Sequence, residues 1–359
     1  MILRCSRVAC PRRHAFRCRM SAWHRAPLIL LRTARSQGLS DDLHVMLRAV
    51  APLECRVIVS PDVRSVDRAH CLICGGDGVH WLGPIDRELR RCRHCRFTWI
   101  VQGVETRPNG KSIYETGDSI VLDPAQADYY RDETAVDAAR EKLAWIRRYA
   151  RSGGRLLDVG ANLGFFVREA AREFRATGIE PGAAVVEFAR REHGVDLLAG
   201  SVYDAADHLT GQFDIVTLFD VLEHLADPGL ALEQCRRLLR PGGYLFVTTP
   251  DTGSLVARML GRHWYYINLH EHVALFNRRH LTTLLARTGL ETVAVRTIGR
   301  SYRWSYIRRH LAVLGRHSTL LRIAHAGAWP LGFRPTARMW INLGDVMGIV
   351  ARVKEPCGS

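Results

Sequence analysis

The sequence predicts an α/β protein that is built on a doubly wound, mostly parallel sheet and carries a small metal-binding ribbon on its N-terminal side. Three observations lead to this prediction. Short apolar segments alternate with helical ones from Arg155 onward, as they do where helices connect parallel strands. A glycine-bearing turn follows the first of those segments, and two CxxC pairs lie ahead of it.

The basic character of the chain is concentrated at its N-terminus. The 359 residues contain 51 Lys and Arg and 36 Asp and Glu, a net charge of +15, and residues 1–65 contribute 12 Arg against 4 acids. Only three of the basic residues are Lys, a skew that fits a general arginine bias as well as it fits a nucleic-acid surface. Residues 1–45 hold no acid before Asp41, similar to an organelle transit peptide; a disordered tail or an extension upstream of the true start explains this more simply.

The remaining composition is that of a globular protein, with 47% apolar and 24% charged residues. No apolar run approaches the ~20 residues that a membrane-spanning helix requires, and we expect a cytoplasmic protein. The composition divides the chain into an Arg-rich tail over 1–65, a zinc-ribbon-like module over 66–105, a linker with a cap helix over 106–150, the main α/β domain over 151–300, a helical insertion over 301–340, and a last strand with the C-terminus over 341–359.

Four cysteines have the spacing of a structural zinc site. Cys71 and Cys74 form one CxxC pair, and Cys92 and Cys95 form a second pair after 17 intervening residues. Each CxxC turn presents two thiolates to one side of a metal, and four thiolates complete the tetrahedron that Zn²⁺ prefers. Because four protein ligands leave no open position, we expect a structural Zn²⁺; disulfides or free buried cysteines are the alternatives.

The strands and helices of the main domain follow from apolar runs and helical periodicity. We expect strands over 155–159, 176–179, 197–199, 213–218, 244–248 and 292–297, and helices over 127–150, 165–174, 183–192, 228–239, 254–260 and 279–288. Two short strands, near Trp81 and over 97–101, belong to the ribbon. Val346–Val353 is expected as a last strand at the edge of the sheet.

The turn after the first strand has the features of a cofactor-binding loop. It reads Asp158-Val-Gly160-Ala-Asn162-Leu-Gly164, and Glu180 follows 22 residues after Asp158 at the end of the next strand. Gly160 permits a tight turn and a close approach to a ligand, and Gly164 permits close packing of helix on strand. A carboxylate at about 20 residues can accept hydrogen bonds from ribose hydroxyls, and the carboxylate of Asp158 suits a cationic ligand better than a pyrophosphate.

With these residues the chain resembles the class I S-adenosylmethionine (SAM)-dependent methyltransferases over about residues 155–300. The resemblance implies a Rossmann-like fold and SAM as the cofactor. It implies that Glu180 binds the ribose, and that the methionine part of SAM lies against Asp158, Gly160, Asn162 and Gly164.

Two further stretches extend the resemblance. Gly200-Ser201-Val202 is similar to the adenine-side loop, which implies that Ser201 and the backbone at Val202 contact the cofactor. The residues from Asp220 to Pro228 are similar to the signature that follows the fourth strand, which implies that Asp220 also lines the cofactor site.

The segments outside this core resemble sugar methyltransferases of polysaccharide and natural-product pathways. The order of a paired CxxC ribbon, Tyr129-Tyr130-Arg131 and a methyltransferase core is similar to theirs, and Leu269–Phe276 contains a His-Glu-His element like that of deoxysugar C-methyltransferases. In those enzymes the second His, here His272, is a candidate general base.

Methyl transfer from a sulfonium is an in-line displacement, and an alcohol or an enolisable carbon must also lose a proton. His272 and His224 are the candidate bases, because His is the side chain that accepts a proton most readily near neutral pH. Glu271 is a candidate for orienting His272. Packing and helix capping are the alternative roles of these residues.

We therefore predict a SAM-dependent methyltransferase with a structural Zn²⁺ and a small-molecule acceptor, a sugar above all. Two other functions stay open: an RNA methyltransferase that holds nucleic acid with its ribbon and basic surface, and a non-catalytic zinc-ribbon interaction protein. Residues 301–340 are rich in Arg and aromatic side chains and could contact a membrane surface as an amphipathic helix; a helical insertion packed on the sheet is the simpler interpretation.

Overall fold

The computed structural model describes residues 70–83, 88–100, 133–267, 272–304 and 337–353. The chain divides into two units, Met1–Val59 and Ser60–Ser359, and all described residues belong to the second. Several predictions therefore lie outside the described residues: the tail over 1–65, the Tyr129-Tyr130-Arg131 segment and the role given to Glu271.

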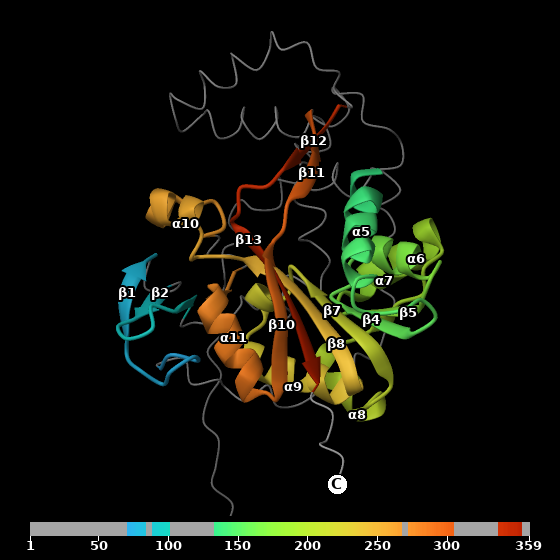
Figure 1. Ribbon diagram of the computed structural model, residues 1–359, viewed down its shortest axis with the longest axis horizontal. Coiled ribbons are helices and arrows are strands. Elements are labelled where there is room, and N and C mark those ends of the chain that lie inside the picture. The colour runs from blue at the N-terminus through green and yellow to red at the C-terminus, as the bar shows by residue number, and fades with distance from the viewer. Residues whose placement is uncertain (1–69, 84–87, 101–132, 268–271, 305–336, 354–359) are drawn as a thin grey trace, which may run out of the picture. The chain divides into compact units, whose positions relative to one another are not determined.

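A seven-stranded sheet with helices on both faces forms the main domain (Figure 1). The strand order is β10-β13-β8-β7-β4-β5-β6. Pairing is parallel from β6 through β8, and β13 runs antiparallel to both β8 and β10, which confirms the mostly parallel α/β fold. The strands are β4 (Arg155–Val159), β5 (Arg175–Glu180), β6 (Leu198–Ala199), β7 (Phe213–Phe219), β8 (Leu239–Pro250), β10 (Leu290–Thr297) and β13 (Val346–Val353).

The position of β13 differs from the prediction, which placed Val346–Val353 at the edge of the sheet. The strand lies between β8 and β10, with Val350 opposite Phe246 on one side and opposite Ala294 on the other. Its first six residues are all buried. A strand that is apolar on both faces needs cover on both faces, and an interior position between β8 and β10 provides it.

Two helical layers cover the sheet. The helices α5 (Glu133–Ile146), α6 (Phe165–Ala170) and α7 (Ala183–His193) pack on one face, and α8 (Val202–His208), α9 (Pro228–Leu238) and α11 (Arg278–Arg287) pack on the other. Side chains alternate along a strand, so Leu156 of β4 packs with α5 and α6 whereas Leu157 packs with α8, α9 and α11. Helix α8 was not among the predicted helices.

The cysteine ribbon is a small antiparallel sheet that includes a strand of the main domain. Its strands are β1 (Gly78–Leu82), β2 (Leu89–Cys92) and β3 (Thr98–Ile100), and β9 (Ala274–Leu275) pairs with β3 at the end of the order β1-β2-β3-β9. Because β9 precedes α11 in the chain, the ribbon is hydrogen-bonded directly to the domain that carries the predicted active site.

The ends of the predicted helical insertion over 301–340 are strands. β11 (Arg300–Arg303) pairs antiparallel with β12 (Arg338–Ile341), and a side chain at Gly299 would overlap the ring of Trp340. The helical prediction is therefore wrong for the two ends of this stretch, where the pairing joins residues that lie far apart in the sequence. Residues 305–336 lie outside the described part of the chain.

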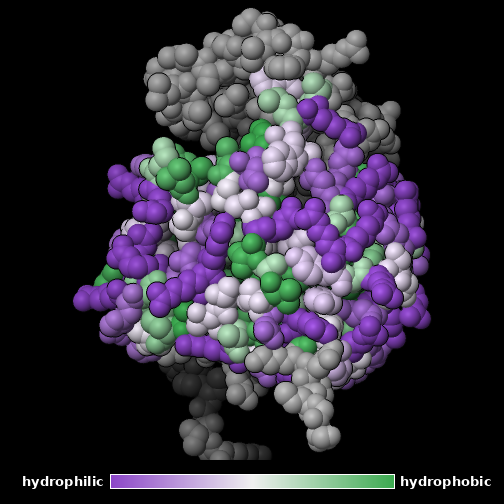
Figure 2. Space-filling model, viewed as in Figure 1, coloured by the Kyte–Doolittle hydropathy of each residue, from purple (hydrophilic) through white to green (hydrophobic). Residues whose placement is uncertain are grey.

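Helices that could reach across a membrane are absent from the described ranges, since none combines the necessary length and apolar character. The face drawn in Figure 2 is largely hydrophilic, with apolar side chains gathered over α10 (Leu255–Leu260). Leu255, Met259 and Leu260 are exposed there, so α10 supplies an apolar patch of this face.

Candidate active site and metal centre

The loops that hold the predicted cofactor residues meet at the carboxyl end of the sheet. After β4 the chain continues to β5 and β6 on one side, whereas β7 and β8 lie on the other. Neighbouring β4 and β7 therefore form the switch point at which open α/β sheets bind ligands. The loop after β4 contains Gly160, and the loop after β7 begins at Asp220.

Asp158 is a buried carboxylate near the end of β4. Its Oδ1 accepts a hydrogen bond from Thr217 Oγ1 of β7 over 2.5 Å. Burial raises the pKa of Asp158 to about 6, against the opposing effects of the Thr217 hydrogen bond and the charge of Lys142. A carboxyl group with this pKa is mostly ionised at pH 7, and the site therefore offers a negative charge to a cationic ligand.

The turn after β4 has three residues in the left-handed region, Gly160 (φ 73°), Asn162 (φ 50°) and Gly164 (φ 75°). A Cβ at Gly160 would lie 2.6 Å from Cγ2 of Val221, and a Cβ at Gly164 would lie 2.9 Å from Cγ1 of Val195. The absence of a side chain at Gly160 thus lets the loops after β4 and β7 approach each other.

Glu180 closes the turn from the end of β5. Its Oε2 accepts from the backbone N–H of Asn162 over 2.9 Å, and its Oε1 accepts from Gly182 N–H over 3.0 Å. Burial raises the pKa of Glu180, and these two hydrogen bonds oppose the rise. Each carboxylate oxygen can accept a second hydrogen bond, so the fixed side chain can still receive ribose hydroxyls.

Ser201 and Val202 have structural roles at the start of α8. The Ser201 hydroxyl accepts from the N–H of Asp204 over 3.4 Å, and the Asp204 carboxylate accepts from Ser201 N–H over 3.0 Å, forming a capping box. The Val202 side chain is buried in the core. A contact between the adenine and the backbone here stays a prediction.

Asp220 follows β7 in the left-handed region, at φ 59°. Its Oδ1 accepts from Thr248 Oγ1 over 3.0 Å and pairs with Arg300 Nη2 over 2.8 Å. Burial raises the pKa of Asp220, but Arg300, Lys142 and Thr248 outweigh this and hold it below its ordinary value. Asp220 is therefore a second anion at the switch point.

Lys142 of α5 is a site residue that the sequence analysis missed. Its ammonium lies 4.6 Å from the ring centroid of Phe219. Burial lowers its pKa, and attraction to Asp220 and Asp158 opposes the decrease. It is the sole lysine among the residues that the structure describes. In a chain whose basic residues are nearly all Arg, a lysine on the predicted cap helix was the available sequence signal for a special role.

The two predicted histidines meet although 48 residues separate them in the sequence. The ring centroids of His224 and His272 lie 4.8 Å apart, and their ligand atoms lie within 4.8 Å of a carboxylate oxygen of Glu223. Glu223 is buried, accepts from Thr249 Oγ1 over 2.9 Å, and has its pKa raised by burial to about 7 while His272 opposes the rise. Glu223 was not among the predicted site residues, and the predicted partner of His272, Glu271, lies outside the described residues.

The hydrogen bond of His272 defines its tautomer. Nδ1 lies 2.7 Å from the carbonyl oxygen of Tyr266, and because a carbonyl only accepts, Nδ1 carries the proton and neutral His272 has its lone pair on Nε2. Burial lowers the pKa of His272, and neighbouring His224 lowers it further. A neutral imidazole that presents Nε2 can act as a general base.

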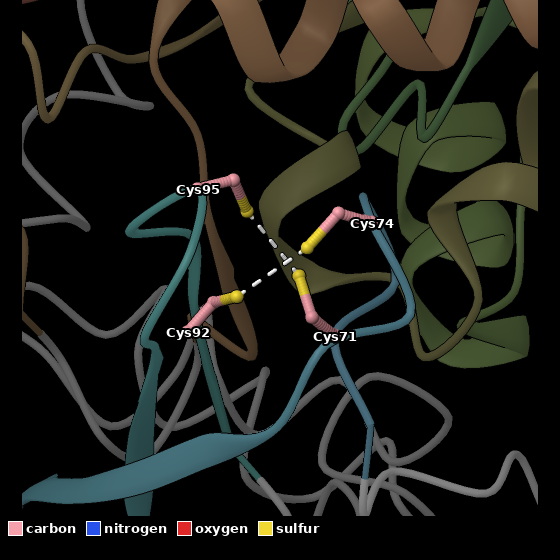
Figure 3. Close-up of side chains that lie close together, drawn as sticks. All are labelled: Cys71, Cys74, Cys92 and Cys95. Carbon is pink, nitrogen blue, oxygen red and sulfur yellow. Dashed lines mark hydrogen bonds between the residues drawn. The ribbon is translucent and has the colours of Figure 1, made fainter.

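The four predicted zinc ligands converge in the ribbon. Figure 3 shows the sulfurs pointing toward one another, with 3.4 Å between Cys71 Sγ and Cys95 Sγ and 3.4 Å between Cys74 Sγ and Cys92 Sγ. A Zn–S distance of about 2.3 Å places the sulfurs of a regular tetrahedron about 3.8 Å apart. The donor set and its spacing therefore fit Zn²⁺ in a closed, structural site.

Comparison with known proteins agrees with the fold and the cofactor loops. Residues 127–295 match the family described as "Methyltransferase domain". The ubiquinone biosynthesis O-methyltransferase of Aromatoleum aromaticum is 33% identical over 175 residues, which are 45% of this chain and 74% of that protein. That of Erwinia tasmaniensis is 36% identical over 121 residues, 32% of this chain and 50% of that protein.

The strand order and the turn after β4 define the α/β fold and the cofactor-site geometry of a methyltransferase domain. The chain belongs to the class I SAM-dependent methyltransferases. It spans about half the length of several of the curated relatives that it matches.

Two solved structures are similar to the chain. A SAM-dependent methyltransferase from Thermotoga maritima, a possible histamine N-methyltransferase, covers 64% of this chain and 95% of its own at 20% identity and a TM-score of 0.41. A complex of the Haloferax volcanii Trm112 methyltransferase activator with a methyltransferase covers 69% of this chain and 100% of its own at 15% identity and a TM-score of 0.47.

Proposed function

We propose that this methyltransferase transfers the methyl group of SAM to a hydroxyl of a small-molecule acceptor, a sugar of polysaccharide or natural-product biosynthesis. The observation that carries the proposal is the placement of His272. Its Nδ1 is engaged by the Tyr266 carbonyl, which leaves the lone pair on Nε2, and its ring lies in a cluster with Glu223 and His224 beside the cofactor loop that begins at Asp220. A hydroxyl needs such a base, whereas an amine with its own lone pair does not.

The charges at the switch point complement SAM. Asp158 supplies an anion for the ammonium of the methionine part, Lys142 supplies a cation for its carboxylate, and Glu180 supplies acceptors for the ribose hydroxyls. This pairing of opposite charges supports the assignment of SAM to the loops after β4, β5 and β7.

The reaction is an in-line displacement at the methyl carbon. The acceptor oxygen forms a C–O bond as the C–S bond breaks, and the sulfur keeps the electron pair and becomes the neutral thioether of S-adenosylhomocysteine. The hydroxyl proton passes to Nε2 of His272. Glu223 lies close enough to stabilise the resulting imidazolium, as its effect on the pKa of His272 indicates.

A cavity beside Asp220 supports a sugar acceptor. Its lining includes the cations of Lys142, Arg148, Arg296 and Arg300, the acids Glu141 and Asp220, and Trp340. The Trp340 side chain is 62% exposed, so a ring face is available for the apolar face of a sugar. With Lys142 assigned to the cofactor, the lining keeps three Arg against two acids, and this positive surplus favours an acceptor that also carries a phosphate or a carboxylate. The O-methyltransferase names of the relatives support oxygen as the acceptor atom.

We also propose that the cysteine ribbon holds one structural Zn²⁺ through Cys71, Cys74, Cys92 and Cys95. The convergence of four sulfurs supports this assignment. The metal would fix the ribbon and leave the chemistry to the site at the switch point.

The test is a methylation assay with purified enzyme, SAM and a panel of nucleotide-linked sugars, in which S-adenosylhomocysteine is quantified and the product is identified by NMR. We expect an O-methyl sugar, and Trp340→Leu should raise KM for the sugar while the Kd for SAM is unchanged. If the enzyme methylates RNA and not these sugars, and if its RNA binding weakens steeply with salt, the sugar proposal is wrong and the RNA methyltransferase alternative holds.

A further inference from the structure

We propose that the cysteine ribbon is a positioning element of the active site, and that His280 couples the metal state of the ribbon to the position of His272. The inference rests on the proposed role of His272 as the base and of the four cysteines as zinc ligands. It assigns the ribbon a part in turnover beyond stabilising the fold.

The ribbon is paired with the segment that follows His272. Thr98 and Trp99 of β3 lie opposite Leu275 and Ala274 of β9, and Ile100 donates its N–H to the carbonyl of Val273 over 2.9 Å. His272 is therefore one residue away from a backbone hydrogen bond to the ribbon.

Val273 is also hydrogen-bonded to the segment that follows β7. Val273 donates its N–H to the carbonyl of Glu223 over 2.8 Å, and Glu223 belongs to η3 (Leu222–His224). Val273 thus bridges the ribbon and the signature after β7. A shift of the ribbon would pull on the residue next to His272, because both backbone groups of Val273 are engaged.

His280 links this segment to a zinc ligand. Its Nε2 donates to the carbonyl of Cys95 over 2.8 Å, and its Nδ1 accepts from the N–H of Asn277 over 3.3 Å. Its ring is fully buried and packs edge-on against Phe97 at 5.4 Å, and Phe97 lies 5.4 Å from Phe276. The start of α11 and the end of β9 are therefore docked on the second CxxC turn.

The coupling follows from this chain of contacts. Zn²⁺ holds the CxxC turns closed, which fixes the carbonyl of Cys95 and the edge of β3. Without the metal, four neighbouring thiols lose their common partner, the turn relaxes, and β9 loses its docking surface. The residues assigned to SAM lie on α5 and at the ends of β4, β5 and β7. Because the ribbon pairs with β9 instead, loss of metal should reduce turnover while SAM affinity is retained.

The experiment compares the full-length enzyme loaded with zinc and treated with a chelator under reducing conditions. Hydrogen exchange of residues 273–276 should accelerate at least about tenfold without zinc, while exchange in β4 and β5 and the Kd for SAM change by less than about twofold. Added Zn²⁺ should restore the slow exchange. Unchanged exchange at 273–276 with faster exchange in β1 and β2 would overturn the inference.

Two variants separate coupling from folding. His280→Leu should retain one equivalent of zinc and normal SAM affinity but accelerate exchange at 273–276 and lower kcat. His280→Gln, whose amide can donate to the carbonyl of Cys95, should recover part of both losses. The matched control is His208→Leu at an exposed position of α8, which should behave as wild type.

The inference is also overturned if His280→Leu has wild-type exchange and kcat. If His280→Leu does not fold, the chelation experiment and the His280→Gln variant still test whether the ribbon is coupled to residues 273–276. Exchange and metal content need no acceptor, so failure of the sugar proposal would leave these readouts intact.

Discussion

The imidazole Nδ1 of His272 lies 2.7 Å from the backbone carbonyl of Tyr266. This hydrogen bond assigns the proton of the neutral ring to Nδ1 and directs the basic lone pair of Nε2 away from Tyr266. A base made in this way acts only while it is neutral, so the rate of methyl transfer should report the protonation of His272.

The first prediction concerns the pH dependence of kcat. Burial and His224 lower the pKa of His272, while Glu223, the Tyr266 carbonyl and Asp220 oppose the decrease. Because the pKa of His272 is lowered below its ordinary value of about 6.5, kcat should be constant near neutral pH and fall about tenfold per pH unit below that pKa. Burial raises the pKa of Glu223 to about 7, so this carboxyl is largely neutral in the pH range of the acid limb, and Glu223→Gln should leave the position of that limb nearly unchanged. An acid limb centred above pH 7, or one that vanishes in Glu223→Gln, would contradict this assignment.

The second prediction concerns the ribose carboxylate. Glu180→Gln places an NH₂ group against either the Asn162 or the Gly182 N–H, both of which now donate to a carboxylate oxygen. Loss of a charge-assisted hydrogen bond costs about 1.5–3 kcal/mol, or roughly 10–100-fold in SAM affinity. Calorimetric titration with SAM measures it, with exposed Glu187→Gln on neighbouring α7 as the control. Equal affinities of the two variants would remove Glu180 from the site.

The third prediction concerns the cation on the cap helix. Lys142→Met leaves Asp158 and Asp220 without their shared ammonium and should weaken SAM binding by about tenfold, since the methionine carboxylate loses its opposite charge. Lys142→Arg should restore part of the affinity. Arg151→Met, at an exposed position beyond α5, is the control, and wild-type affinity of Lys142→Met would contradict the role given to this side chain.

The sequence was sufficient for the elements whose signals are local. The strand 155–159 is β4 residue for residue, and the helix expected over 183–192 ends one residue short of α7. Glu180 ends β5, 22 residues after Asp158, and this local spacing was enough to predict a ribose-binding acid. Local spacing also located the four cysteines, which the structure brings together.

The remainder depends on contacts between distant segments. No local pattern indicates that β13 inserts between β8 and β10. None indicates that β9 pairs with β3 of the ribbon, where Leu275 lies opposite Thr98, 177 residues earlier in the chain. Glu223 and Lys142 became site residues only when the fold placed them beside His272 and Asp220. The available signal for Glu223 was its position directly before His224 in the segment that follows β7. The sequence prediction instead chose an acid next to His272 in the chain.

The fourth prediction concerns the turn after β4. Gly160→Ala places a residue with a side chain in the left-handed region, which costs about 1–2 kcal/mol of stability. It also brings a Cβ to 2.6 Å from Cγ2 of Val221. Gly153→Ala has the same left-handed requirement, at φ 89°, but meets nothing within 4 Å. Gly160→Ala should therefore be less stable to urea than Gly153→Ala and should bind SAM more weakly. Equal losses of stability in the two variants would show that close approach to Val221 is not required.

The central claim is that His272 is the base for methyl transfer, and one pair of measurements on His272→Ala tests it most directly. The variant should bind SAM with a Kd within about twofold of wild type, because the cofactor residues lie on other loops. Its single-turnover rate should be lower by about 10²–10⁴-fold, the usual contribution of a general base. A near-normal rate with intact SAM binding would contradict the account.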